Sequence, residues 1–204
     1  MYQPQKYKNN TSPFIYAFIQ KYPFATIVLQ GEKLLGTHVP VLVENNENGF
    51  RLFAHIANHN SMLPYIQDRK EMLLIFKGPD AYVSSSWYAA PDIPTWDYAA
   101  VHINARIKIQ SDIELCDSLQ KLILHFESNS QNPLRPEDIP KDIWDENFRE
   151  ITGFWLEPLE CLGIEKLHQG FNPTDITRIT EKLRIMGSCP MSQLADQIHR
   201  KHNK

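Results

Sequence analysis

Apolar and polar residues alternate along the middle of the chain with the period of two that is typical of β-strands. In residues 98–110 this alternation predicts a strand with one buried face, formed by Val101, Ile103, Ala105, Ile107 and Ile109. Residues 25–30 and 34–44 are β-branched runs separated by a polar turn around Gly31. They are therefore predicted to form a hairpin.

Three further segments are predicted as strands, at 50–56, 71–78 and 153–163. Five or six consecutive strands with polar turns between them favour a small antiparallel barrel, closed or partly closed, over a parallel sheet. Side chains fill the interior of so small a barrel. Ligands are therefore expected at its mouths or between subunits.

Helical periodicity replaces this pattern towards both ends of the chain. Residues 13–21 and 111–128 are predicted as amphipathic helices, the second with Ser111 as its cap. Further helices are predicted at 60–67, 143–152, 174–186 and 190–200. We expect a mainly β, α+β fold in which helices flank the barrel. The organisation is one domain over residues 1–204, with 174–204 as a C-terminal helical extension.

The composition is that of an ordinary globular protein, with 42% hydrophobic residues, 22% charged residues and a net charge of -3. This balance provides no overall field for a phosphate backbone, so charge does not support DNA as a partner. Residues 174–204 hold six basic and three acidic side chains, but no recognition helix follows their last helix. A capping helix with a solvated basic end is the simpler interpretation.

Neither a targeting signal nor a membrane span is expected. The basic residues at the amino terminus are not followed by an apolar run, and the longest apolar stretch, 72–76, is too short to cross a bilayer. The three cysteines are odd in number and share no CxxC spacing. They predict inert thiols in a cytoplasmic protein.

Polar side chains concentrate in the sequence HIANHN, residues 55–60, where a strand is predicted to meet a helix. Free amide groups at a helix amino terminus bind anions, so residues 57–61 are a candidate phosphate cradle with Asn58 or Asn60 as additional donors. The alternative is that Asn60 only caps its helix. His55 and His59 have no identifiable third ligand, so no metal site is expected.

A second unusual stretch, GPDAYVSSSWYAAPDIPTWDY, covers residues 78–98 and carries two Trp and three Tyr residues. Each aromatic ring taken singly fits a role in the core. The serines at 84–86 lie in no GxSxG elbow, and no histidine is marked as their base. We therefore assign no catalytic residue.

Several segments occur in an order that resembles the PaiB family of bacterial FMN-binding negative transcriptional regulators. They are YQPQKY, YPFATIV, THVPVLV, HIANHN, FKGPDAYVSSSWY, IPTWDYAAVH, ITGFWLE and KLHQG, and they extend from Tyr2 to about Gly170. PFAT alone is weak, whereas GPxAYVSxSWY followed by PTWxY is specific.

The resemblance implies a split β-barrel that forms a homodimer, with flavin mononucleotide bound between the subunits. The flavin phosphate is then expected near the turn at 55–60, and the aromatic segments are expected beside the flavin ring and the dimer seam. The cofactor-binding residues that it implies are His38, Pro40, His55, Ala57, Asn58, Asn60, Ser84, Trp87, Tyr88, Thr95, Trp96, Lys166 and Gln169.

Several positions depart from the family pattern. Asn58 replaces an arginine in H-x-A-R-x-N-P, Asp97 replaces the asparagine of PTWNY, and His168 and Gly170 replace the serine and the asparagine of KLSQN. Losing the arginine turns a charge-assisted phosphate contact into a neutral one, which corresponds to roughly tenfold to a hundredfold in FMN affinity. Lys166 then becomes the candidate for neutralising the phosphate.

The resemblance predicts a regulatory protein of the PaiB type that binds FMN at a dimer interface. The first alternative is an FMN-dependent reductase or oxidase of the same architecture. The second is a DNA-binding regulator without flavin.

Overall fold

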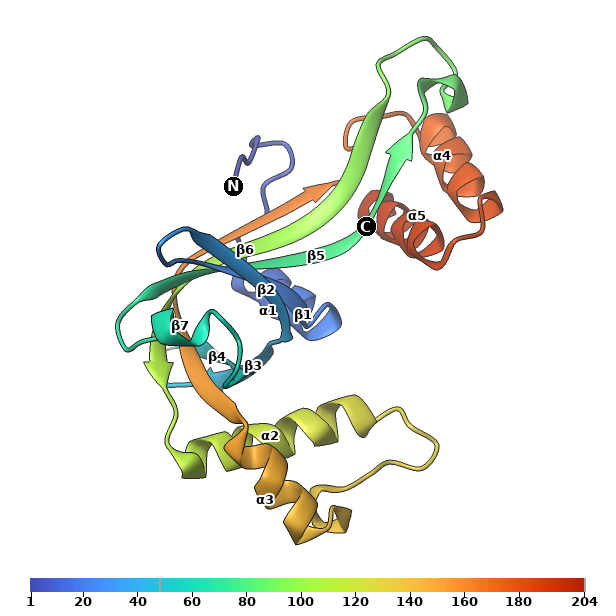
Figure 1. The fold of residues 1–204 in the computed structure, drawn as a ribbon. Coiled ribbons are helices and arrows are strands. Elements are labelled where there is room, and N and C mark those ends of the chain that lie inside the picture. Colours follow the sequence, from blue (N-terminus) through green and yellow to red (C-terminus); the bar gives the residue numbers. More distant parts are fainter. Residues whose placement is uncertain (48, 204) are drawn as a thin grey trace. The chain divides into compact units, whose positions relative to one another are not determined.

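The computed structural model describes residues 1–47 and 49–203, and this part of the chain forms a seven-stranded sheet (Figure 1). The strands are β1 Phe24–Gln30, β2 Leu34–Pro40, β3 Leu42–Asn46, β4 Gly49–Ala57, β5 Glu71–Val83, β6 Thr95–Ile109 and β7 Ile151–Lys166. Their order in the sheet is β2, β1, β5, β6, β7, β4 and β3. The pairs β1–β2, β1–β5, β3–β4 and β4–β7 are antiparallel. The sheet confirms the predicted mainly β class.

Helices precede, interrupt and follow the strands. They are α1 Ser12–Lys21, α2 Asp112–Glu127, α3 Lys141–Arg149, α4 Pro173–Ile185 and α5 Cys189–His202, with short 3-10 turns at Leu63–Tyr65, Ser85–Trp87 and Pro136–Asp138. The predicted start of α2 is confirmed, because Ser111 Oγ accepts from the Glu114 N–H and the Glu114 carboxylate accepts from the Ser111 N–H in a capping box.

The chain divides into two compact units. The first consists of residues 1–18, 76–102 and 161–204, and the second of residues 19–75 and 103–160. In the first unit α4 and α5 lie side by side (Figure 1) and bury Ile179, Leu183 and Ile198. The same core contains Tyr88 from the aromatic stretch, so the C-terminal helices form one hydrophobic cluster with that stretch.

The amino-terminal segment, residues 1–10, is hydrogen-bonded to β7 within the first unit. Asn9 N donates to Gly163 O at 2.8 Å, and Gln3 Nε2 donates to the same oxygen at 2.7 Å. Gly163 N in turn donates to Asn10 Oδ1 at 2.9 Å. Sequence patterns gave no sign of this attachment, because the segment has neither helical nor strand periodicity.

Two predicted elements differ from the structure at their ends. The strand predicted at 34–44 is divided into β2 and β3 at Val41, whose N–H donates to Pro23 O at 2.8 Å instead of joining the ladder. The helix predicted at 143–152 ends at Arg149, and the β-branched residues Ile151 and Thr152 begin β7.

The helix predicted at 60–67 is wrong in type and length, since only Leu63–Tyr65 forms a 3-10 turn. The chain beyond it is held by β6 instead. Arg69 N donates to Ile107 O at 2.9 Å, and Ile107 N donates to Lys70 O at 2.8 Å. Arg69 has a φ of 68°, which reverses the chain and is incompatible with a continuing helix. The phosphate cradle predicted at 57–61 therefore lacks the helix amino terminus on which it depended.

Candidate functional site

The predicted site residues fall into two sets, one in each compact unit. Those of the first unit are Ser84, Trp87, Tyr88, Thr95, Trp96, Lys166 and Gln169, and those of the second are His38, Pro40, His55, Ala57, Asn58 and Asn60. Each set is therefore considered within its own unit.

In the first unit, the aromatic stretch begins where β5 ends. Ser84 Oγ accepts from the Ser86 N–H at 3.3 Å and thereby caps the 3-10 turn that carries Trp87. Trp87 packs on the hydrophobic cluster of α4 and α5. Ala89 N donates to Asp175 Oδ1 at 2.6 Å, which ties the stretch to the first turn of α4. Ser84 and Trp87 thus support the backbone of this stretch.

Tyr88 is buried and lies in a chain of three polar side chains. Its hydroxyl is 2.8 Å from His168 Nε2, and His168 Nδ1 is bonded to Asp97 Oδ2. Asp97 and His168 are 0% and 3% exposed. The arrangement assigns the Nδ1–H of His168 to the Asp97 carboxylate and the Tyr88 O–H to Nε2. Local sequence patterns give no sign of this hydrogen-bonded set, because Asp97 and His168 are 71 residues apart.

Burial dominates the electrostatics of the Tyr88–His168–Asp97 chain. It raises the pKa of Asp97, while the hydrogen bond and the charge of His168 act in the opposite direction. Burial, assisted by the negative charge of Asp97, raises the pKa of Tyr88 to about 12. Asp97 Oδ1 has no hydrogen-bond partner among residues 1–47 and 49–203. The three side chains therefore form a buried hydrogen-bonded network in which His168 is the partner of both Tyr88 and Asp97.

Lys166 and Gln169 are both bonded to nearby backbone. The Lys166 ammonium donates to Thr95 Oγ1 and, at 2.8 Å, to Trp96 O. Gln169 accepts from the Leu167 N–H at 2.8 Å and donates to Glu165 O. Lys166 thus places a positive charge beside the backbone of Trp96. The Gln169 side chain instead bonds the backbone of the turn that contains it.

Trp96 and Tyr82 offer exposed ring surface in the same unit. Trp96 is 55% exposed and Tyr82 is 46% exposed, and their rings meet edge to face with centroids 6.2 Å apart. Exposed aromatic rings of this size are typical of surfaces that bind a planar ligand or another protein. Of the predicted aromatic residues Trp87, Tyr88 and Trp96, Trp96 is the most exposed.

In the second unit, Asn58 holds the turn at 55–60 to the junction of α3 and β7. Its Nδ2 donates to Arg149 O at 2.7 Å, its Oδ1 accepts from Thr152 Oγ1 at 2.7 Å, and its backbone N–H donates to Glu150 O at 2.7 Å. Asn60 Oδ1 accepts from the Met62 N–H at 2.9 Å, but Met62 is the N-cap of the 3-10 turn and that turn has no side-chain cap, so Asn60 does not cap a helix. Both amides are thus engaged with the protein itself.

The remaining residues of the second set lie on strands. His38 is on β2 and stacks on Phe24 of β1 at 6.0 Å between centroids, and Pro40 is opposite Phe24 in the register of the hairpin. His55 and Ala57 are on β4 and line a cavity that also touches α2 and α3. Burial lowers the pKa of His55, so its imidazole is neutral at pH 7.

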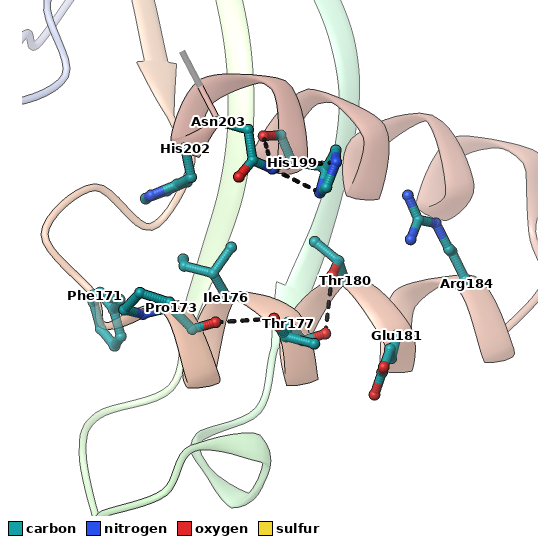
Figure 2. A pocket seen from close by; sticks show the side chains of 10 residues that line it. All are labelled: Phe171, Pro173, Ile176, Thr177, Thr180, Glu181, Arg184, His199, His202 and Asn203. Atoms are coloured by element: carbon teal, nitrogen blue, oxygen red, sulfur yellow. Dashed lines mark hydrogen bonds between the residues drawn. The ribbon is translucent and has the colours of Figure 1, made fainter.

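A cavity of about 300 Å³ in the first unit is lined mainly by residues of α4 and α5 (Figure 2). Several of its polar groups are bonded within the lining: Thr177 donates to Pro173 O, Thr180 donates to Thr177 O, and Asn203 is bonded to the His199 ring. Arg184 on its rim is paired with Asp196 at 2.9 Å. These pairings leave few groups to recognise a ligand.

Two structural absences are relevant to function. Within residues 1–47 and 49–203, no group of three His, Cys, Asp or Glu side chains could hold a metal ion. Over the same described part of the chain, every helix is too short or too polar to cross a membrane.

Sequence comparison finds a family match and a full-length relative. Residues 1–158 match the family described as "Putative FMN-binding domain". The chain is 27% identical over 205 residues to the Protease synthase and sporulation protein PAI 2 of Bacillus subtilis strain 168, covering 100% of this chain and 99% of the relative.

Solved structures with the same fold include two flavin proteins. The FAD and heme binding protein of Mycobacterium smegmatis superposes with a TM-score of 0.62 at 11% identity, covering 83% of this chain and 78% of that one. The flavocytochrome Anf3 of Azotobacter vinelandii superposes with a TM-score of 0.60 at 12% identity, covering 83% and 74%. The similarity confirms the predicted split-barrel fold.

Proposed function

Because the chain belongs to the FMN-binding domain family that its residues 1–158 match, we propose that it binds flavin mononucleotide and acts as a regulatory protein. The observation that carries the proposal is the exposed Trp96–Tyr82 pair, with the Lys166 ammonium bonded to the Trp96 carbonyl. A flat indole ring is suited to stacking on the flavin ring. A bound flavin would supply redox chemistry at this surface.

The described residues fit the ring of FMN better than its phosphate. The Trp96 side chain is 55% exposed, and Lys166 supplies a positive charge. At the turn of residues 55–60, by contrast, the Asn58 amide is already bonded to Arg149 O and Thr152 Oγ1. Lys166 is therefore our preferred partner for negative charge on the ligand.

We further propose that the exposed aromatic surface is shared between two copies of the chain. Ile93, three residues before Trp96 in the sequence, is also 79% exposed. Exposed aromatic and aliphatic side chains of this kind are enriched at the centres of homodimer interfaces. A homodimer with the flavin at its seam would cover this surface.

Regulation through a ligand is favoured over direct contact with DNA. Two of the basic residues in the C-terminal helices are paired within the protein, Lys201 with Glu165 at 2.7 Å and Arg184 with Asp196 at 2.9 Å. These pairs reduce the positive charge available to phosphate groups. The regulatory role that the family resemblance implies is then assigned to a flavin-dependent change of state.

Titration with FMN tests the proposed cofactor. We expect saturable quenching of flavin fluorescence by the parent protein and an affinity about tenfold lower after Trp96→Ala, because one stacked aromatic ring contributes about 1 kcal/mol or more. Ile185→Ala is the control, since Ile185 is an apolar residue on α4 that is 77% exposed and lies outside the predicted site, and it should leave the affinity unchanged. Absence of quenching with folded parent protein would eliminate the flavin proposal.

The role of the turn at 55–60 is tested separately by Asn58→Arg. If this turn binds the phosphate, the new guanidinium should strengthen FMN binding by roughly tenfold or more. The same change removes the bonds to Arg149 O and Thr152 Oγ1, and we expect it to lower the free energy of unfolding by about 1 to 3 kcal/mol. Unchanged FMN affinity in the folded variant would place the phosphate elsewhere.

A further inference from the structure

The second unit contains a cavity of about 480 Å³ bordered by β4, β7, α2 and α3. Most of its wall is apolar, with Leu119 and Ile123 from α2 and Ile143, Trp144 and Phe148 from α3. The volume lies within the range of pockets that bind small molecules, and an apolar wall with a few polar groups is typical of such pockets. The cavity is therefore large enough for a molecule of several rings.

Two histidines in the wall, His55 and His59, make no side-chain hydrogen bond to residues 1–47 or 49–203, and His59 is exposed to solvent. His55 projects from β4 into the lining. The ring is half-buried, and burial lowers its pKa. A neutral imidazole has one nitrogen that accepts and one that donates, so it can bond a hydroxyl or a ring N–H of a ligand.

The charges around the cavity disfavour an anionic occupant. Its lining includes no Lys or Arg side chain, and the exposed carboxylate of Glu150 lies on its rim. An anion buried there would lose its hydration without gaining a countercharge. Phosphate-bearing nucleotides such as FMN are therefore poor candidates for this cavity, and it differs from the flavin site proposed above.

The Asn58 bonds connect two segments that line the cavity. Ala57 and His59 flank Asn58 in the chain, and Glu150 and Ile151 belong to the other segment. Asn58 joins the two segments, because its backbone and side chain bond Glu150 O and Arg149 O. This part of the wall is thus held in place by the protein itself, which lowers the entropic cost of binding.

We propose that this cavity is a binding site for a neutral aromatic molecule that carries a hydroxyl or a ring N–H, with His55 as its hydrogen-bond partner. Trp144 and Phe148 contact the rings of the ligand, and the aliphatic residues of α2 enclose its far end. Such a ligand is chemically distinct from flavin, and its site lies within one compact unit of the chain. The protein then has a second small-molecule binding site besides that of the proposed cofactor.

2-Naphthol is a suitable probe because it is fluorescent, neutral at pH 7 and small enough for the cavity, and naphthalene is the matched probe without a hydroxyl. We expect saturable binding of 2-naphthol to the full chain. His55→Leu should weaken 2-naphthol binding about tenfold and leave naphthalene binding unchanged, because one hydrogen bond is lost while the apolar contacts remain.

A second pair of variants tests the location without altering His55. Ile143→Asp introduces a carboxylate into the wall at a residue that is 48% exposed, and it should weaken both probes at least tenfold. Leu124→Asp is the control, because Leu124 lies on α2 outside this cavity and is 53% exposed. It should leave both affinities unchanged.

Three results would overturn the assignment: no saturable binding of either probe to the parent, equal binding by the parent and the Ile143→Asp variant, or tighter binding of 2-naphthoate than of 2-naphthol. FMN titration of the Ile143→Asp variant separates this proposal from the proposed cofactor. Retained FMN affinity with lost naphthol affinity supports two distinct sites. Equal loss of both ligands would contradict them.

Discussion

Replacing His168 by Ser is expected to lower the free energy of unfolding by about 3 to 5 kcal/mol, because it leaves a buried carboxylate without its partner. Asp97 is 0% exposed, and its Oδ1 already lacks a hydrogen bond within the described part of the chain. The Tyr88 hydroxyl, which lies 2.8 Å from His168 Nε2, would lose its acceptor as well. Urea unfolding followed by circular dichroism measures the effect.

A double-mutant cycle with Asp97→Asn identifies the cause. Asparagine carries no charge, so we expect the double variant to recover about 2 kcal/mol relative to His168→Ser alone. The effects of the two single changes would then be far from additive. Additive losses would show that His168 contributes through its volume and its contact with Phe171 rather than through Asp97.

The pH dependence of stability provides a second readout of the same carboxyl group. Burial raises the pKa of Asp97 from its usual 3.8, so the folded state favours the protonated form. The contribution of Asp97 to stability is therefore fully present below pH 4 and is lost as the pH rises through the folded-state pKa. As the pH rises above 4, the parent should lose stability relative to the Asp97→Asn variant.

Gly163→Ala is expected to cost about 3 kcal/mol by displacing the amino-terminal segment from β7. A Cβ at this position would lie 2.2 Å from Asn9 O and 2.8 Å from the Phe14 ring. Because Asn9 O is a backbone atom, it cannot move away from the new methyl group as the end of a flexible side chain could. The bonds that Gly163 makes to Gln3, Asn9 and Asn10 would then break together.

Gly36→Ala is the matched control for this change. A Cβ at Gly36 would meet its nearest atoms at 3.7 and 3.9 Å, which is ordinary van der Waals contact. We expect unfolding curves of this variant to overlay those of the parent within about 0.5 kcal/mol. Hydrogen exchange should show loss of protection at Asn9 and Glu165 in Gly163→Ala alone. Retained protection at both amides would contradict the proposed displacement.

Local periodicity was sufficient to predict most of the secondary structure. The alternation from Val101 to Ile107 corresponds to buried residues of β6, and the Ser111–Glu114 capping box begins α2 as predicted. Predictions failed where distant hydrogen bonds determined the local conformation. Arg69 and Lys70 are held by Ile107, a residue nearly forty positions away, and no pattern within a short window could indicate this.

The candidate site was less predictable for the same reason. Residue types suggested a phosphate contact for Asn58, but its amide bonds Arg149 O and Thr152 Oγ1, which lie 91 and 94 residues away. Tyr88 was predicted to line the flavin, and it instead lies in a buried chain with His168, 80 residues away. Sequence identified unusual residues, whereas only the fold could show which of them face one another.

Asp97 and His168 also constrain how this part of the sequence can change during evolution. The two side chains are buried and bonded to each other. Changing His168 first would leave the Asp97 carboxylate buried without its partner. Changing Asp97 to asparagine first removes the charge before the partner is lost. A stepwise replacement of this pair is therefore expected to be tolerated only when it begins at Asp97.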